Sequence, residues 1–437
     1  PRTPLPRGKT MLTKKTASAL VLAMSTLLPG LGPAQPWSRA LARLAEGLRL
    51  GRLTVVFPDG TQRVISGRDG DAGGRGVLIL RSDAAARALF LGGDTGFAEA
   101  YMDGLWDSPD LTALIGLAAV NQRALGTNDF GGLGPVRLLD RLRHRLRRNS
   151  KRGAKRNIAY HYDLGNAFYQ GWLDPSMTYS SALFEGESES LEAAQTRKYQ
   201  RLAALLSLEP GMRVLEIGCG WGGFAELAAR DYGVEVVGIT LSQEQLSWGR
   251  ERIRRAGLEG KVDLRLQDYR DVTGQFDRVV SIEMFEAVGQ DHWPIYFESL
   301  RARLKPGGLA ALQVITIAAD RFEDYRSGAD FIQKHIFPGG MLPSVPRLLE
   351  AIDKAGLVGA EVQRFGLSYA RTLDLWQRAF QHAWPRLAGE TGFSDRFRRM
   401  WEYYFAYCQA GFTEGIIDVG FYTAQRPDED PRAPTDR

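Results

Sequence analysis

The segment VLEIGCGWGG, residues 214–223, joins a short apolar run to four glycines, and the helix-like stretch FAELAARDYG follows it. A buried strand that runs through glycines into a helix is typical of parallel sheets that bind a nucleoside ligand, because glycine lets the ligand approach the backbone. The loop lacks the Gly-Lys-Ser/Thr ending of a phosphate-binding P-loop. An ordinary tight turn is the alternative interpretation, since a glycine-rich loop alone is weak evidence for a ligand.

The acidic residue of this segment narrows the choice of ligand. Glu216 stands directly before the turn, where a carboxylate suits a ligand with a cationic or hydroxyl-rich part better than it suits pyrophosphate. S-adenosylmethionine has a sulfonium, an ammonium and a ribose but no phosphate, and it fits this pattern. We expect Cys219 to pack beside the ligand and not to act as a nucleophile. The expected loop contacts are Gly218, Cys219, Gly220, Trp221 and Gly222.

Two further stretches extend the expected ligand site. Thr240 or Gln245, at the end of the second strand, is the candidate for the ribose hydroxyls, where nucleoside enzymes often place an acid. Ser242 is equally well explained as the N-cap of the next helix. Asp268-Tyr269, after the third strand, stands where a contact to an adenine edge is expected, and a surface turn is the alternative. The full set is Thr240, Leu241, Ser242, Gln245, Asp268 and Tyr269.

Alternating strand-like and helix-like stretches predict an α/β fold from about residue 200 onward. A doubly wound, Rossmann-like sheet covered by helices on both faces accounts for this alternation. A helical, aromatic-rich region over residues 369–412 interrupts it before a last strand, IIDVGFYTAQ. The other strand-like runs are RVLEIG, EVVGIT, VDLRLQ, FDRVVSIEM and LAALQVITI.

The part of the chain before this region predicts a smaller α+β domain. LTVVFPDG and TQRVISG predict a β-hairpin that turns at Asp59-Gly60. SDAAARALFLGG predicts a helix that begins after Ser82 and ends at the glycine pair. We therefore divide the chain into an N-terminal segment, the small domain, a basic linker and a cofactor-binding domain with helical lid insertions. Their respective ranges are 1–36, 37–125, 126–156 and 157–437.

Composition and charge limit the class of protein. The 437 residues are 44% hydrophobic and 24% charged, which excludes a wholly disordered, collagen-like or multispan membrane chain. Two cysteines cannot form a disulfide framework, and this favours a reducing, cytoplasmic location. Ten Lys/Arg and one acid lie between Arg137 and Arg156, while the whole chain carries only +5. The basic character is therefore concentrated in one segment, where leucines form an apolar stripe among the arginines.

The N-terminal segment contains an apolar run, Ala17–Leu31, that follows two lysines and superficially resembles a secretory signal. The run is too short, and too often interrupted by polar residues, proline and glycine, to span a bilayer as a helix. We expect instead a helix that docks on the body of the protein or on a membrane surface.

Six motifs follow one another along the chain. HYDLGNAFYQGWLDPSMTYSSALF precedes VLEIGCGWGG, GITLSQEQ, SIEMFEAVG, KHIFPGGMLPS and SYARTLDLW. Together they resemble the cyclopropane-fatty-acyl-phospholipid synthases and their mycolic-acid relatives over about residues 157–425. The N-terminal region resembles the small, lipid-associated domain of the bacterial members that act on phospholipids. The resemblance implies S-adenosylmethionine-dependent methyl(ene) transfer to the cis double bond of an unsaturated phospholipid acyl chain, which forms a cyclopropane through a carbocation.

The resemblance also implies the groups that remove the proton when the ring closes. Family members hold a bicarbonate ion as base with a glutamate, a tyrosine, a cysteine, a histidine and a backbone amide. Ser181 and Gln313 stand at the cysteine and histidine positions, and they donate hydrogen bonds but supply no thiolate or imidazole. The expected catalytic set, carried over by motif, is Glu286, Tyr369, Ser181, Gln313 and Ile315.

Other side chains belong to the implied site in lesser roles. Tyr179 and Ser180 are expected cofactor contacts by motif. Glu283 stands three residues before Glu286, and we interpret it as a cofactor contact or a helix-opening acid, outside the catalytic set. One or two aromatic rings are expected to shield the carbocation, the rest being core. The aromatic candidates are Trp376, Phe380, Trp401, Tyr403, Tyr404, Phe405 and Phe412.

The departures from the family pattern keep other functions open. A rewired base site favours methyl-branching of an unsaturated chain without ring closure, including a furan fatty acid route. A lipid-binding homologue with impaired catalysis is the alternative from another class, and a small-molecule or RNA methyltransferase is disfavoured. We expect an unsaturated membrane phospholipid and an anionic membrane surface as partners, with no nucleic acid and no metal. The expected location is cytoplasmic, peripherally on the inner membrane; the oligomeric state is open, a homodimer being one alternative.

The basic segment generates a test of membrane binding. Replacing Arg141, Arg145 and Arg148 by glutamine should weaken binding to anionic vesicles, because each basic residue near such a surface contributes about 1 kcal/mol. Co-sedimentation with vesicles at moderate salt measures this. An unchanged bound fraction would show that the segment does not contact lipid.

Overall fold

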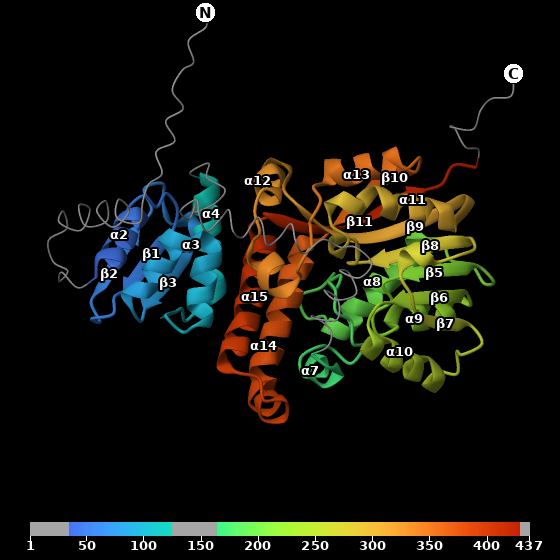
Figure 1. Cartoon of the computed structure of the whole chain (residues 1–437), viewed down its shortest axis with the longest axis horizontal. Helices are drawn as coiled ribbons and strands as arrows, with labels where there is room; N and C mark the ends of the chain where they lie inside the picture. Colours follow the sequence, from blue (N-terminus) through green and yellow to red (C-terminus); the bar gives the residue numbers. More distant parts are fainter. Residues whose placement is uncertain (1–34, 125–163, 429–437) are drawn as a thin grey trace, which may run out of the picture. The chain divides into compact units, whose positions relative to one another are not determined.

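The computed structural model describes residues 35–124 and 164–428 (Figure 1). The chain divides into two compact units, Pro1–Leu133 and Gly134–Arg437. The apolar run Ala17–Leu31 and the basic linker over 126–156 lie outside the described residues, so both interpretations stay predictions.

The first unit is built on a four-stranded sheet in the order β2-β1-β3-β4. β1 pairs antiparallel with β2 around the turn at Asp59-Gly60, which confirms the predicted hairpin, and runs parallel to β3. The helix predicted after Ser82 is confirmed, and its first part ends at the glycine pair as predicted, because Gly93 has non-helical backbone angles (φ 60°, ψ −151°). A second helical part, which the sequence pattern did not predict, follows this kink and continues α3 to Met102. The elements are α2 (Pro36–Ala45), β1 (Arg52–Val56), β2 (Gln62–Ser66), β3 (Arg75–Leu80), α3 (Asp83–Met102), β4 (Trp106–Asp107) and α4 (Leu111–Ala124).

The second unit contains a seven-stranded sheet in the order β10-β11-β9-β8-β5-β6-β7. The five strands from β9 to β7 run parallel, and β11 and β10 add antiparallel to that edge. The predicted α/β sheet is therefore confirmed, with an additional strand, β10, that the sequence pattern did not reveal. The strands are β5 (Arg213–Ile217), β6 (Glu235–Thr240), β7 (Val262–Leu266), β8 (Phe276–Ile282), β9 (Leu304–Ile317), β10 (Val358–Arg364) and β11 (Ile417–Gln425).

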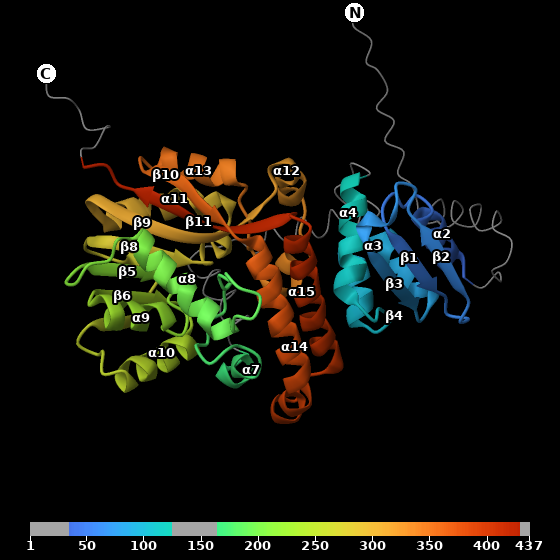
Figure 2. The same ribbon diagram turned by 180° about the vertical axis from the view of Figure 1, so that it is seen from behind.

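Helices cover both faces of this sheet (Figures 1 and 2). Alternate residues of β5 point to opposite faces. Leu215 and Ile217 join a hydrophobic core with α11 and α13, while Glu216 faces Lys198 of α8 and Ala225 of α9. The helices of the second unit are α7 (Asn166–Gln170), α8 (Leu191–Leu205), α9 (Gly223–Tyr232), α10 (Gln243–Arg255), α11 (Trp293–Arg303), α12 (Phe322–Arg326), α13 (Val345–Lys354), α14 (Gly366–Thr391) and α15 (Asp395–Thr413).

The long helices α14 and α15 pack side by side and contact β11, as Figure 2 shows. They account for the helical, aromatic-rich region predicted over residues 369–412. Among the residues that the structure describes, no helix is both long and apolar enough to cross a membrane.

Close packing between β6, β7 and the glycine loop predicts a sensitive position at Gly238. A Cβ atom there would lie 2.6 Å from Cδ2 of Leu264 and 3.0 Å from Cβ of Cys219. Gly238→Val should therefore lower the free energy of unfolding by about 1–3 kcal/mol, measured by urea denaturation. Gly260→Ala is the control, because a Cβ atom there meets nothing within 4 Å. Equal urea midpoints for the two variants would contradict this account of the packing.

Candidate active site

The turn after β5 lies directly against the segment that follows β8. Gly218 has a φ of 85°, in the left-handed region that favours glycine. A Cβ atom at Gly218 would lie 2.8 Å from Cγ of Met284, so a side chain there would collide with the residue between Glu283 and Phe285. The expected cofactor loop and the expected base are therefore neighbours. Positive φ angles of 51° and 82° are also found at Gly220 and Gly222.

The Glu216 carboxyl is buried next to this turn. The residue is 2% exposed, and its Oε2 atom has no hydrogen-bond partner among the described residues. Burial raises the pKa of Glu216 to about 8, although the backbone N–H of Ala225 and the charge of Lys198 oppose the shift. A buried carboxyl with an unpartnered acceptor atom favours a cationic ligand. The site therefore fits the cationic part of S-adenosylmethionine, as the sequence predicts.

The ribose candidates lie together at the end of β6. Thr240 Oγ1 donates a hydrogen bond to Gln245 Oε1 at 2.8 Å, across the start of α10. Ser242 Oγ accepts from the backbone N–H of Gln245 at 3.3 Å, so Ser242 is the N-cap of α10. Leu241 stands between them in the connection. The structure thus brings Thr240 and Gln245 into contact and gives Ser242 the structural role that was its alternative.

The remaining cofactor candidates are each held by protein contacts. Asp268 forms an ion pair with Arg270 at 2.6 Å, and the Arg270 guanidinium lies over the Tyr269 ring at 5.3 Å. Trp221 donates from Nε1 to Asn166 Oδ1 at 2.7 Å. Cys219 is buried, and burial raises the pKa of its thiol well above the ordinary value, which agrees with a packing role.

The segment that carries Tyr179, Ser180 and Ser181 contacts Glu283 through the backbone N–H of Ser181. Tyr179 and Tyr404 of α15 share a hydrogen bond between their hydroxyls at 2.9 Å. Ser180 Oγ accepts from Nζ of the fully buried Lys198 at 2.6 Å. The Ser181 hydroxyl donates to the carbonyl of Ala182 at 2.9 Å.

The donors of the expected bicarbonate site converge on Glu283 instead. Glu283 Oε1 accepts from the backbone N–H of Ser181 at 2.8 Å and from Gln313 Nε2 at 2.6 Å. Glu283 Oε2 accepts from the Tyr369 hydroxyl at 2.6 Å. Burial raises the pKa of the Glu283 carboxyl, and the Tyr369 hydrogen bond and the charge of Lys198 oppose the shift. Three members of the expected catalytic set thus bind this one carboxylate.

Glu286 holds the remaining expected donor. Its Oε1 atom accepts from the backbone N–H of Ile315 at 2.5 Å, and its Oε2 atom is buried without a hydrogen-bond partner in the part of the chain that the structure describes. Burial, reinforced by repulsion from Glu283, raises the pKa of Glu286 to about 8. Glu286 is therefore a neutral acid at pH 7, next to a carboxyl that is surrounded by donors.

These contacts do not fit a bound bicarbonate. The donor groups of Ser181, Gln313 and Tyr369 already form hydrogen bonds with the Glu283 carboxylate. The backbone N–H of Ile315 forms one with Glu286. From the sequence we interpreted Glu283 as a cofactor contact or a helix-opening acid, outside the catalytic set. Glu283 instead has a φ of 49° and precedes a 3₁₀ turn, Phe285–Ala287, so its carboxyl points differently from a helical residue. The sequence signal that could have indicated Glu283 is the presence of two glutamates shortly after a strand, in SIEMFEAVG.

Lys198 provides positive charge beside this cluster. The side chain lies on α8, is fully buried and reaches Ser180. Burial lowers the pKa of Lys198 to about 7, while nearby carboxylates, that of Glu283 first among them, oppose the shift. No sequence signal separated this lysine from those on the surface.

Aromatic rings surround the Tyr369 side of the cluster. The Tyr369 ring stacks on Phe412 with centroids 4.4 Å apart and meets Trp376 edge-on at 6.1 Å. Trp376 in turn lies 5.3 Å from Tyr179. All seven aromatic residues expected from the sequence are buried, and Phe380 of α14 contacts Trp401 and Phe405 of α15. The seven residues are Trp376, Phe380, Trp401, Tyr403, Tyr404, Phe405 and Phe412.

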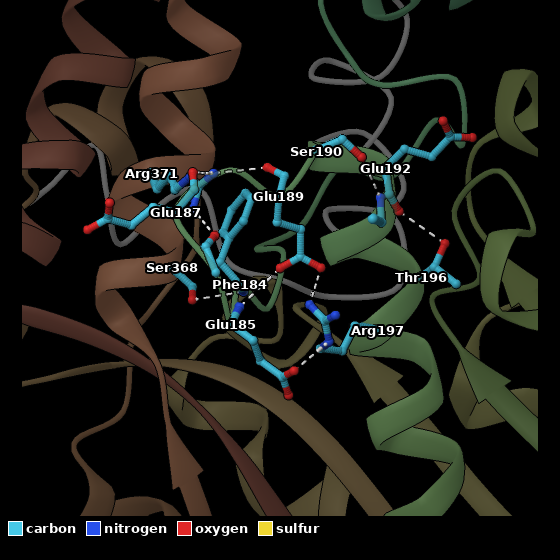
Figure 3. A network of polar contacts seen from close by, with 12 residues as sticks. Phe184, Glu185, Glu187, Glu189, Ser190, Glu192, Thr196, Arg197, Ser368 and Arg371 are labelled. Carbon is cyan, nitrogen blue, oxygen red and sulfur yellow. Dashed lines mark hydrogen bonds and ion pairs between the residues drawn. The ribbon is translucent and has the colours of Figure 1, made fainter.

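Polar contacts hold the segment before α8 onto α14 (Figure 3). The Arg371 guanidinium donates to the carbonyls of Gly186, Glu187 and Glu189 and lies 4.0 Å from the centroid of the Phe184 ring. The backbone N–H groups of Ala182 and Phe184 donate to Thr372 and Ser368, at 3.1 and 3.2 Å. The segment that carries Ser180 and Ser181 is thereby fixed relative to the helix that carries Tyr369.

No group of histidine, cysteine, aspartate and glutamate side chains within residues 35–124 and 164–428 is arranged to hold a metal ion.

Comparison with known proteins identifies the family of this chain. The model of the mycolic acid cyclopropane synthetase family matches residues 149–421. The chain is 38% identical over 397 residues to the tuberculostearic acid methyltransferase UfaA1 of Mycobacterium tuberculosis, which covers 89% of this chain and 90% of that protein. It is 38% identical over 331 residues to the cyclopropane-fatty-acyl-phospholipid synthase of Escherichia coli, which covers 75% of this chain and 82% of that protein.

Solved structures support the same relationship. The mycolic acid cyclopropane synthase CmaA1, complexed with SAH and CTAB, is 32% identical and superposes with a TM-score of 0.58 over 62% of this chain and 98% of that one. The cyclopropane synthase MmaA2 from Mycobacterium tuberculosis gives the same values. The chain therefore belongs to the mycolic acid cyclopropane synthetase family and is an S-adenosylmethionine-dependent methyltransferase.

Proposed function

We propose that this enzyme transfers the methyl group of S-adenosylmethionine to the cis double bond of an unsaturated acyl chain in a phospholipid and closes a cyclopropane ring. The observation that supports this most is the Glu283 carboxylate, which accepts three hydrogen bonds beside the glycine loop and the aromatic rings of α14 and α15. A buried base, a cofactor loop and aromatic faces are what carbon methylation of an alkene requires.

The residues divide the chemical work between them. The cofactor supplies an electrophilic methyl group on a positively charged sulfur. Glu216 and the glycine loop would hold the cofactor, with Thr240 and Gln245 toward its ribose. An alkene is a weak nucleophile, so the enzyme must align it with the methyl group and keep water from the resulting carbocation. The rings of Tyr369, Trp376 and Phe412 suit the second task, because a desolvated cation gains about 2 kcal/mol from a good aromatic contact.

The lipid substrate is supported by the relatives. The Escherichia coli relative is named for fatty-acyl-phospholipid substrates and covers 75% of this chain. A basic segment with a leucine stripe, residues 137–156, suits anionic head groups. We propose that the enzyme works at the cytoplasmic face of the membrane, where its acyl substrate lies.

Methyl-branching without ring closure is the second candidate. The relative that matches along 89% of this chain is named tuberculostearic acid methyltransferase, and a Pseudomonas putida relative, 40% identical over 273 residues, is named probable fatty acid methyltransferase. Both products require the loss of one proton after methyl transfer. A saturated branch requires a reductant in addition.

Incubation of the purified protein with methyl-labelled S-adenosylmethionine and a phospholipid that carries a cis-monounsaturated chain tests the reaction. We expect the acyl chain to gain one CH2 unit, 14 mass units plus the mass of the isotope label, and to resist hydrogenation, because a ring has no double bond. The same gain in a product that hydrogenation converts to a saturated branch would establish the second candidate. No label in lipid, with the cofactor still bound, would contradict both and indicate a non-catalytic lipid-binding protein.

The buried Glu216 predicts that cofactor affinity depends on pH. Its pKa of about 8 means that Glu216 is protonated at pH 6, and a cationic ligand must displace this proton. Affinity for S-adenosylmethionine should therefore rise about tenfold per pH unit from pH 6 to pH 8 and then level off, because one proton is released on binding. Isothermal titration calorimetry measures the affinity and the proton release.

Variants separate this effect from other titrations. Glu216→Gln should weaken binding at pH 8 and reduce the slope, the remainder being due to Lys198, which loses charge over the same range. Glu235→Gln, an exposed position at the start of β6, is the matched control and should leave the slope intact. An equal slope in Glu216→Gln and the control would rule out Glu216 as the group that meets the cofactor cation.

A further inference from the structure

The carboxylate of Glu283 is surrounded by hydrogen-bond donors in the way that a bound anion is surrounded in an anion-binding site. It has three donors, the Ser181 amide, the Gln313 side chain and the Tyr369 hydroxyl, and they come from a loop, β9 and α14. None of the three donors lies on the same element as Glu283, which follows β8. The surrounding fold therefore provides the hydrogen bonds that a separate small anion would need.

Burial raises the pKa of Glu283, and the hydrogen-bond donors and the charge around its carboxylate oppose that shift. Three donors aimed at two oxygen atoms match a carboxylate, which only accepts hydrogen bonds. The buried ammonium of Lys198 on α8 attracts it. Glu286 is the acid that faces it from the 3₁₀ turn, and repulsion between the two carboxyls raises the pKa of Glu286 to about 8. Tyr369 stays a donor, because burial raises the pKa of its phenol well above the ordinary value. Of the two glutamates, Glu283 is the one whose carboxylate is stabilised by three donors, whereas Glu286 has one, which makes Glu283 the candidate proton acceptor.

The backbone at Glu283 is an independent indication. Its φ of 49° lies in the left-handed region, and Glu283 is one of three non-glycine residues with a positive φ within residues 35–124 and 164–428. A long side chain in a conformation that favours glycine persists only where the surroundings over-determine it, and such residues cluster at functional sites. Glycine would satisfy this backbone and leave the space of the carboxylate open.

We propose that Glu283 is the catalytic base and that its carboxylate occupies the place of the exogenous bicarbonate, so that this enzyme needs no bound anion. The proposal rests on the proposed function, since it names the proton acceptor of that reaction. Lys198 is then a positioning residue that keeps the base ionised.

The proton-transfer step balances without a further reagent. After methyl transfer, a C–H bond of the new methyl group breaks and its electron pair forms the third bond of the ring at the cationic carbon. If a hydride shift first moves the cation to the carbon that carries the new methyl group, the same pair forms a C=CH2 double bond, a methylene branch on the open chain. In both cases the proton passes to a Glu283 carboxylate oxygen, which becomes a neutral acid and later returns the proton to solvent.

Anion binding tests the proposal independently of turnover. Binding of ¹³C-labelled bicarbonate, followed by NMR line broadening, should be absent in the wild type and present in Glu283→Gly, because the variant opens the space and frees the three donors. Glu283→Gln, whose amide fills the space, should not bind the ion. Bicarbonate binding in the wild type that Glu283→Gly does not strengthen would overturn the proposal, whether or not the enzyme transfers methyl groups.

Chemical rescue tests the catalytic role. The wild type should keep its rate in bicarbonate-free buffer, and Glu283→Gly should form product at least about 100-fold more slowly, as expected for loss of a general base. Formate, acetate or bicarbonate should restore product formation in Glu283→Gly with saturation, and should not do so in Glu283→Gln. A several-fold loss of wild-type rate without bicarbonate, or a fully active Glu283→Gln, would contradict the proposal.

The controls separate this result from unfolding and from a wrong function. Ser207→Gly relieves a positive φ of 46° at an exposed position on the C-terminal side of α8, and it should leave the rate unchanged. Cofactor affinity and melting temperature of each Glu283 variant report on folding. A wild type that transfers no methyl group to any unsaturated phospholipid would refute the proposed function, while the bicarbonate-binding result would still decide whether Glu283 fills the anion site.

Discussion

The carboxylate of Glu283, which is buried in the protein, is the group around which this site is organised. Removing a carboxylate from water is strongly unfavourable unless hydrogen bonds and an opposite charge replace the solvent. The Ser181 amide, Gln313, Tyr369 and the Lys198 ammonium do so for Glu283. Their elements are far apart in sequence, so the loop, α8, β9 and α14 must all be in place before the charge is stable. The Arg371 contacts with the loop serve that same requirement.

Two glutamates only three residues apart thereby receive opposite properties. Glu283 has three donors and a nearby cation, whereas Glu286 has one backbone donor and an unpartnered oxygen. Environments that differ in this way separate the proton affinities of like groups and assign acid and base roles. Glu216, buried directly before the glycine turn, differs from both glutamates. One of its carboxyl oxygens has no hydrogen-bond partner among the described residues, which suits a contact with a ligand cation. Which carboxyl groups have hydrogen-bond partners, and which do not, thus indicates the chemical role that each can have in the site.

The relationship to the cyclopropane synthases explains why the donors persist while their anion differs. Tyr369 and the amide of Ile315 stand at positions that the family motif assigns to the ion, and both donate to a carboxylate in this chain. A side chain tethered to the fold loses less entropy on occupying the site than a free ion, because its translation is already restricted. Ser181 and Gln313 then need only supply neutral hydrogen bonds. Their departure from cysteine and histidine is consistent with a site that holds its own anion.

Local patterns in the sequence were sufficient to predict the Rossmann-like sheet, the hairpin at Asp59-Gly60 and the glycine turn after β5, since strand periodicity and glycine turns depend on neighbouring residues. The same reasoning missed β10, whose residues are mostly exposed at a sheet edge, and the second part of α3 beyond the kink at Gly93. It also named most donors of the base site by motif but not the group that they bind. Only the tertiary structure decided that Glu283 lies among them and that Lys198 faces it, because a left-handed backbone and contacts between distant elements leave no periodic trace in the chain.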